Sequence, residues 1–246
     1  MSSRQDRERE HFDQLAGESG EIWWGSTTYA GKRRLQRRAD LIAAFLKGRG
    51  TGLAVLELGC GTGALTQYLL ERLSVELTAC DISPVTVERI RERYGAYPNT
   101  HFLAADATNL DVPAGSFDVV LGNSVLHHLP LEPALREIHR VLKPGGVLWF
   151  SEPNMLNPQI ALEKNVRFIG ERLQNSEDET AFFRWSLARK LRSQGFAQVQ
   201  VRPYDFLHPI VPAPLVPLAA GLGELLEATP LLREIAGSLE IHGVRG

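Results

Sequence analysis

The sequence predicts an α/β protein whose mostly parallel sheet is covered by helices on both faces. Between residues 53 and 150, short apolar runs alternate with segments in which apolar residues recur at helical spacing. The short runs are almost continuously apolar, as expected for parallel strands buried between two layers of helices. No internal repeat interrupts this alternation.

The predicted elements of this region follow one another in strand–helix order. Strands are expected at residues 53–58, 75–80, 101–104, 117–121 and 147–150, and helices at 64–73, 84–94 and 132–142. The Lys-Pro-Gly-Gly segment at residues 143–146 is expected to end the last of these helices, because proline and glycine do not continue a helix.

Further elements flank this region on both sides. Helices are expected at residues 3–15, 32–47, 186–194 and 215–227, and strands at 196–201 and 238–244. Arg34, Arg37 and Arg38 lie in the first half of the helix at 32–47, and we expect them to form a solvated basic face.

Composition excludes several classes of protein. The 246 residues include 27 Lys and Arg against 29 Asp and Glu, a formal net charge of −2, which disfavours a dedicated nucleic-acid binder. With only two cysteines, Cys60 and Cys80, neither a disulfide scaffold nor a thiolate-built zinc site is expected, and no metal is predicted. The charged N-terminus lacks an apolar signal core, and the run 209–223 is too short to span a bilayer, so we expect a cytoplasmic protein.

Polar and glycine residues follow four of the predicted strands, where an open α/β sheet binds its ligands. These residues are Glu57, Gly59, Cys60 and Gly61 after the first strand, Asp81 and Ile82 after the second, Asp106 and Ala107 after the third, and Asn123 and Ser124 after the fourth. Because the carboxyl ends of parallel strands share one edge of the sheet, one composite site is expected there.

The glycine cluster alone leaves two cofactor classes open. Its spacing also satisfies a loosened dinucleotide fingerprint, with Asp81 near the position of a ribose-binding carboxylate. Glu57 disfavours a pyrophosphate and suits a cationic or amine-bearing ligand, and Gly63 comes one position too early for the pyrophosphate pattern. The sequence also lacks a Tyr-x-x-x-Lys pair, so a nicotinamide-dependent oxidoreductase stays as the alternative.

The segment Val-Leu-Glu-Leu-Gly-Cys-Gly-Thr-Gly at 55–63 resembles the first signature of class I S-adenosylmethionine-dependent methyltransferases. Asp81, Asp106, residues 117–120 and residues 141–146 resemble later signatures of the family, in the same order. The resemblance covers residues 40–150 strongly and 185–202 weakly, and it is nearest to the ubiquinone/menaquinone-biosynthesis-like branch that acts on small molecules.

The resemblance implies a Rossmann-like sheet of seven strands, mostly parallel, with the last strand antiparallel. It implies a helical cap over the cofactor site at residues 1–48 and a methyltransferase domain at 49–246. Within that domain, acceptor-pocket or lid insertions are expected at about 153–185 and 203–236.

The implied cofactor is S-adenosylmethionine, and the resemblance assigns it contacts. Gly59 and Gly61, with Cys60 between them, would let the backbone approach the methionine portion, which Glu57 would orient. Asp81 would accept hydrogen bonds from the ribose hydroxyls, and Ile82 would pack on the adenine. Asp106 and Ala107 would contact the adenine, although a turn is the alternative role for Asp106 and the expected one for Asp118. Asn123, beside Ser124, would present its backbone carbonyl to the ammonium group, and Tyr29 and Arg33 would close over the cofactor.

Methyl transfer requires alignment of donor and acceptor, and a base only when the acceptor carries a proton. We identify His127, His128 and Glu152 as candidate catalytic residues. The alternative role of the histidines is loop packing, and that of Glu152 is a hydrogen bond that anchors a loop. The expected acceptor is a hydroxyl of a hydrophobic or lipid-linked small molecule. A non-catalytic cofactor-binding module is a further alternative.

The sequence leaves two hypotheses open for the apolar helix at 215–227. It either covers the acceptor pocket and contacts lipid, with the basic residues 32–38 facing anionic head groups, or it packs inward as an ordinary connecting helix. The sequence predicts no nucleic-acid partner, and it indicates no oligomeric state.

Overall fold

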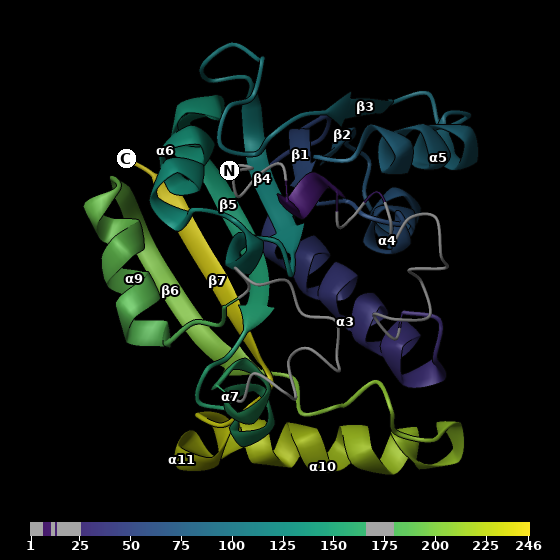
Figure 1. Ribbon diagram of the computed structural model, residues 1–246, viewed down its shortest axis with the longest axis vertical. Coiled ribbons are helices and arrows are strands. Elements are labelled where there is room, and N and C mark those ends of the chain that lie inside the picture. Colours follow the sequence, from purple (N-terminus) through teal and green to yellow (C-terminus); the bar gives the residue numbers. More distant parts are fainter. Residues whose placement is uncertain (1–6, 11–12, 14–25, 166–179) are drawn as a thin grey trace.

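The computed structural model describes residues 7–10, 13, 26–165 and 180–246. Within these ranges, a seven-stranded sheet lies between two layers of helices (Figure 1). The strand order is β3-β2-β1-β4-β5-β7-β6, and only β7 runs antiparallel to its neighbours, β5 and β6. The predicted fold class, a Rossmann-like sheet of seven mostly parallel strands, is confirmed.

The strands are β1 Ala54–Leu58, β2 Glu76–Asp81, β3 Thr100–Ala104, β4 Phe117–Asn123, β5 Leu142–Pro153, β6 Phe196–Tyr204 and β7 Ser238–Arg245. The helices are α3 Tyr29–Leu46, α4 Ala64–Arg72, α5 Pro84–Tyr94, α6 Leu131–Val141, α7 Pro158–Asn165, α9 Arg184–Ser193, α10 Val216–Ala228 and α11 Pro230–Arg233. Two 3-10 turns lie at Leu126–His128 and Ala213–Leu215.

Several predicted boundaries differ from the structure, most clearly the starts of α3 and β5. α3 begins three residues earlier than predicted, because the Thr28 hydroxyl accepts the Gly31 N–H at 2.9 Å and caps the helix. β5 already begins at Leu142, since the Lys-Pro-Gly-Gly segment continues as strand rather than as a turn. Of the helix predicted at 3–15, residues 7–10 and 13 are helical, and the rest lies outside the described residues. Residues 166–179 of the insertion predicted at about 153–185 also lie outside the described residues.

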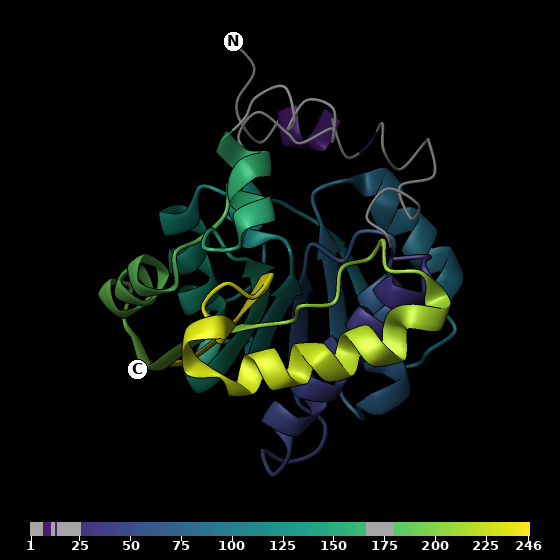
Figure 2. The ribbon, with the colours of Figure 1, turned by 90° about the horizontal axis from the view of Figure 1, so that it is seen from below.

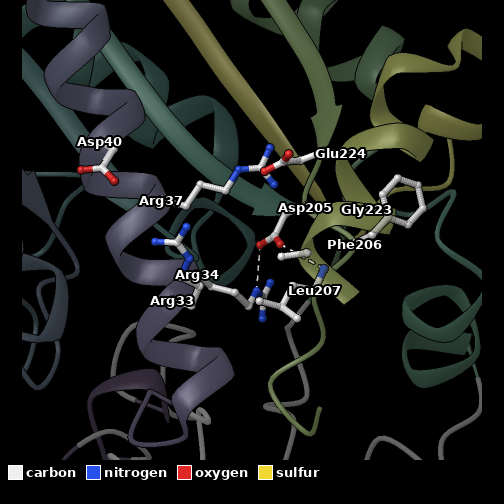
Figure 3. A pocket seen from close by; sticks show the side chains of 10 residues that line it. Arg33, Arg34, Arg37, Asp40, Asp205, Phe206, Leu207, Gly223 and Glu224 are labelled. Atoms are coloured by element: carbon white, nitrogen blue, oxygen red, sulfur yellow. Dashed lines mark hydrogen bonds and ion pairs between the residues drawn. The ribbon is translucent and has the colours of Figure 1, made fainter. Parts of the chain in front are cut away.

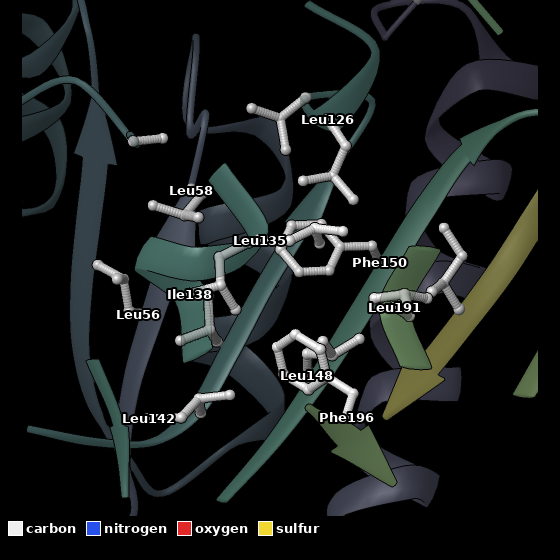
Figure 4. Close-up of a cluster of buried hydrophobic side chains, with 14 of the residues drawn as sticks. Leu56, Leu58, Leu126, Leu135, Ile138, Leu142, Leu148, Phe150, Leu191 and Phe196 are labelled. Carbon is white, nitrogen blue, oxygen red and sulfur yellow. The ribbon is translucent and has the colours of Figure 1, made fainter. Parts of the chain in front are cut away.

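Each face of the sheet is covered by its own helices. α3 and α4 pack on one face, where Ile42, Leu69 and Trp149 are fully buried, and α5 lies beside them. On the other face α6 and α9 close a second apolar cluster (Figure 4). The labelled members of this cluster are Leu56, Leu58, Leu126, Leu135, Ile138, Leu142, Leu148, Phe150, Leu191 and Phe196. Burial on both faces explains why the strands read as continuous apolar runs.

Arg34, Arg37 and Arg38 of α3 are held in ion pairs, with Arg38 buried and the other two partly buried, which corrects the expectation of a solvated face. Arg34 Nε and Arg38 Nη2 lie 2.7 and 3.2 Å from the same Asp205 oxygen. Arg37 forms a two-pronged ion pair with Glu227 of α10, at 2.8 and 2.7 Å. The physical reason is that the end of β6 and α10 supply two carboxylates to this side of α3, which sequence spacing does not reveal.

Asp205→Ala is expected to destabilise the fold by about 3–5 kcal/mol, because it leaves the buried Arg38 guanidinium without its carboxylate. Burial opposes ionisation of Asp205, but the charges of Arg34 and Arg38 prevail and lower its pKa. The stabilisation is therefore present at neutral pH and is lost as the pH falls below the ordinary value of 3.8. Thermal unfolding at pH 7 and pH 3 measures this difference.

Asp40→Ala is the matched control, since Asp40 forms an ion pair of the same length, 2.7 Å, with Arg72 on the surface. Its loss should cost less than about 1 kcal/mol. Equal destabilisation by the two variants would contradict the assignment of a buried network.

Candidate active site

The turn after β1 requires glycine at its first position. Gly59 has a φ of +65°, and a Cβ there would lie 2.6 Å from Cγ2 of Val125, which follows β4. Gly61 also has a positive φ, +51°. The turn therefore lies directly against the loop after β4, in a backbone conformation that favours glycine.

Asp81 joins this turn to the end of β2. Its carboxylate accepts the N–H of Gly61 at 2.9 Å and the N–H of Ser83 at 3.0 Å, and burial raises its pKa. Ile82 next to it is half-buried. The Ser83 hydroxyl donates to Asp13, a contact from the N-terminal segment that the sequence did not indicate.

Glu57 is a second buried carboxyl group below the same turn. The Thr66 hydroxyl of α4 donates to it at 2.7 Å. Burial raises the pKa of Glu57 to about 8, and the charge of Asp81 adds to this effect. Two carboxyl groups with raised pKa values at one sheet edge favour a cationic ligand, because a nearby positive charge would stabilise the ionised forms. Thr66 was missed in the sequence, although a hydroxyl between the buried Leu65 and Leu69 was a usable signal.

Glu57→Gln is expected to stabilise the ligand-free protein increasingly between pH 5 and 8. The folded carboxyl group keeps its proton up to a pH of about 8, whereas the unfolded chain releases it near 4.5. Folding stability from this group therefore falls as the pH rises, by up to about 1.4 kcal/mol per pH unit, and glutamine removes the titration.

Thermal unfolding at several pH values between 5 and 8 tests this expectation, with Glu76→Gln as a control at an exposed glutamate of β2. A difference between wild type and Glu57→Gln that does not change with pH would contradict it.

After β3, Asp106 forms a local turn. Its Oδ1 accepts both the backbone N–H and the hydroxyl of Thr108, each at 2.8 Å, and Ala107 between them is buried. This is the turn that the sequence left as the alternative role, and adenine contact by Asp106 stays a prediction. Asp118, for which a turn was expected, instead accepts the N–H of Ala54 and pairs with Lys143.

The end of β4 carries a polar group that protein atoms do not satisfy. Among the described side chains, Oδ1 of Asn123 is buried without a hydrogen-bond partner. Ser124 next to it has a φ of +56°, and its N–H donates to Ser151 O at 2.7 Å. A buried acceptor without a donor is costly, so a ligand N–H or O–H at this position would be favourable.

Glu152 of β5 forms hydrogen bonds with the loop after β4. One of its oxygens accepts the N–H groups of Val125 and Leu126 at 3.0 and 2.8 Å. The other lies 2.7 Å from Nδ1 of His127 and 3.4 Å from its backbone nitrogen. Since Glu152 is 1% and His127 4% exposed, this pair is held in a fixed geometry inside the protein.

His128 lies beside this pair. The ring centroids of His127 and His128 are 4.1 Å apart, and His128 Nδ1 lies 3.3 Å from a carboxylate oxygen of Glu8. The N-terminal residue Glu8 thus reaches the loop after β4, a contact without any signal in the sequence.

Tyr29 and Arg33 lie on the first turns of α3, and Tyr29 is exposed. Arg33 lines a small pocket between α3 and α10, together with Arg34, Arg37 and Asp205 (Figure 3). No residue of the glycine turn lines this pocket, and closure of Tyr29 and Arg33 over a cofactor stays a prediction.

The sheet order, the antiparallel β7, the glycine turn and the acidic residue after β2 together define the class I methyltransferase arrangement. Residues 56–150 match the family described as a methyltransferase domain. The match shows a methyltransferase domain at residues 56–150, and it agrees with the predicted family, enzyme class and S-adenosylmethionine cofactor.

Related proteins support the same assignment. The chain is 29% identical to 2-methyl-6-phytyl-1,4-hydroquinone methyltransferase of Synechocystis over 78% of its own length and 66% of that protein's. It is 32% identical to 27-O-demethylrifamycin SV methyltransferase of Amycolatopsis mediterranei over 65% and 60% of the two chains. The matched segment thus spans less than two thirds of the length of either relative.

The N-methyltransferase NodS of Bradyrhizobium japonicum, solved with S-adenosyl-L-homocysteine, has the same fold. It superimposes with a TM-score of 0.65 at 16% identity over 98% of this chain and 99% of that chain. No helix within the described residues has the length and apolar character needed to cross a membrane.

Proposed function

We propose that this protein transfers the methyl group of S-adenosylmethionine to a hydroxyl group of a hydrophobic small molecule. The observation that carries the proposal is the buried pair of His127, on the loop after β4, with Glu152 of β5. Val125 of the same loop packs against Gly59 of the glycine turn. A base at this place is needed for a hydroxyl acceptor, which must lose a proton as its oxygen is methylated.

The residues around the glycine turn fit the cofactor. Gly59 lets the turn pack against Val125 with a positive φ, and Glu57 and Asp81 provide buried carboxyl groups next to it. In the proposal, Asp81 holds the ribose hydroxyls, Glu57 orients the cationic methionine end, and the unsatisfied Oδ1 of Asn123 accepts from the ammonium group. Cys60, Gly61 and Ser124 contribute backbone, and Ile82, Asp106 and Ala107 border the adenine.

The cofactor supplies an activated methyl carbon, and the protein supplies alignment, exclusion of water and the base. When Nδ1 of His127 donates its hydrogen to Glu152, the lone pair of the neutral ring lies on Nε2. We assign the base to this nitrogen. Glu152 is a positioning residue in this account, because its carboxylate is inaccessible and already bonded to the loop that carries His127.

The names of two relatives support the choice of acceptor. By name, the first relative methylates 2-methyl-6-phytyl-1,4-hydroquinone, and the second methylates 27-O-demethylrifamycin SV. A hydrophobic acceptor also agrees with the exposed leucines of α10, which lies near the carboxyl edge of the sheet.

A methyl-transfer assay with His127→Ala and His128→Ala tests the proposal. Labelled S-adenosylmethionine would be incubated with lipophilic phenols, hydroquinones and matched amines, and the products identified by mass spectrometry. We expect O-methylated products, and a fall in kcat of about 100-fold or more for His127→Ala with unchanged cofactor affinity. Methylation of amines alone, or a larger loss with His128→Ala than with His127→Ala, would contradict it.

A further inference from the structure

α10 lies at the carboxyl edge of the sheet with its leucines turned outward. Figure 2 looks onto this end of the molecule, where α10 runs along the front. Leu218 and Leu225 are 73% and 69% exposed, whereas the buried residues of the helix are Val216, Gly223 and Glu227. Of the two hypotheses for this helix, inward packing does not describe these leucines.

Polar contacts fix this orientation. Glu227 receives the two-pronged bond from Arg37 and the backbone N–H of Asp205 at 2.9 Å. Val216 packs with Ala30 and Leu207 at the other end of the helix. A rotation that buried the leucines would break the pair of Arg37 with Glu227, so the outward apolar side is built into the fold.

The exposed apolar residues form a ridge that extends beyond the helix. We call it the α10 ridge: Ile210, Leu215, Leu218, Leu222, Leu225 and Leu231. Its end residues, Ile210 and Leu231, are 80% and 85% exposed. No Asp, Glu, Lys or Arg occurs from residue 206 to 223. Leu215, Leu218, Leu222 and Leu225 recur at helical spacing and so share one side of the helix, and a cluster of exposed apolar side chains of this kind marks an interaction site.

Charges beside the ridge indicate which partner fits. α10 itself has no lysine or arginine, but Arg33 of α3 lines the pocket beside Ala220 and Gly223 of α10, and Lys32 next to it is exposed. Two cations at the border of an apolar helix match the phosphates above the acyl chains of a bilayer.

We propose that the α10 ridge is a docking surface for a phospholipid bilayer, with the leucines in the acyl region and Lys32 and Arg33 at the head groups. A second copy of the chain fits less well. Paired helices fix their register through charged residues flanking the apolar seam, and in α10 the only exposed charge is Glu224. Docking would hold the carboxyl edge of the sheet, with its candidate active site, close to the membrane surface.

Vesicle flotation tests this proposal without any methyl acceptor, so its outcome is separate from that of the proposed function. Wild type is expected to float with phosphatidylcholine vesicles, and more fully when phosphatidylglycerol is added. The double variant Leu218→Ser with Leu225→Ser should lose binding by about tenfold or more to both kinds of vesicle. The double variant Lys32→Ser with Arg33→Ser should lose only the increase that phosphatidylglycerol gives.

Tyr97→Ser is the matched control, since Tyr97 is an exposed aromatic residue at the opposite edge of the sheet, between α5 and β3. Circular dichroism and thermal unfolding would confirm that each variant is folded. Wild type that does not float, or leucine variants that float like wild type, would overturn the proposal. A wild-type dimer in light scattering that the leucine variants dissociate would assign the ridge to a second copy instead.

Discussion

Glu152→Gln is expected to abolish most of the methyl transfer and to leave the fold intact. Glutamine has the shape of glutamate, and its carbonyl oxygen can still accept the N–H groups of Val125 and Leu126. Its amide nitrogen then faces Nδ1 of His127, where a carboxylate oxygen lies at 2.7 Å in the wild type. Because an amide N–H is a donor, the ring would place its own hydrogen on Nε2, and the base would be lost.

The expected result is a fall in kcat of about 100-fold or more, with the affinity for S-adenosylmethionine nearly unchanged. Glu152→Ala should in addition lower the free energy of unfolding by roughly 2–5 kcal/mol, because it leaves backbone N–H groups buried without acceptors. Comparison of the two variants separates the effect on the ring from the effect on the loop. Full activity of Glu152→Gln would rule out the assigned role of His127.

Asp81→Ala is expected to weaken binding of S-adenosylmethionine by about 100-fold. In the proposed site the carboxylate accepts hydrogen bonds from ribose hydroxyls, and bonds to a charged acceptor contribute about 1.5–3 kcal/mol each. It also holds the N–H of Gly61, so the glycine turn would lose one of its supports.

Calorimetric titration measures this loss, with Asp111→Ala as a control at an exposed aspartate. Circular dichroism would verify that both variants are folded. Unchanged affinity in Asp81→Ala would show that the cofactor binds elsewhere on the chain.

The sheet could be predicted from the sequence because its strands are buried on both faces. Such strands appear as apolar runs such as Leu53 to Leu58, and the glycine turn that follows marks the edge where a ligand binds. The positions of Glu57, Asp81, Asp106 and Asn123 at that edge follow directly from the strand ends. Their roles toward the cofactor came from the family resemblance.

The contacts that the sequence did not reveal are long-range. Arg38 and Asp205 are far apart along the chain, and nothing in the spacing of the arginines on α3 indicates that β6 ends beside them. For Glu152 the sequence left a catalytic role and a loop-anchoring hydrogen bond open, and it did not indicate which loop is bonded, because that depends on how β5 lies beside β4.

The sequence pattern also did not determine that the leucines of α10 face outward. Helical spacing showed that Leu218, Leu222 and Leu225 share a face, but a shared apolar face is ordinarily the buried one. The ion pair of Glu227 with Arg37 decides the orientation, and nothing in the sequence indicates that these two residues pair.

Calorimetric titration of the wild-type protein with S-adenosylmethionine and, separately, with NAD tests whether the site at the glycine turn binds S-adenosylmethionine. We expect saturable binding of S-adenosylmethionine at one site per chain, competition by S-adenosylhomocysteine, and no heat with NAD. Binding of NAD without binding of S-adenosylmethionine would contradict the account, because Glu57 below the glycine turn would then face a pyrophosphate.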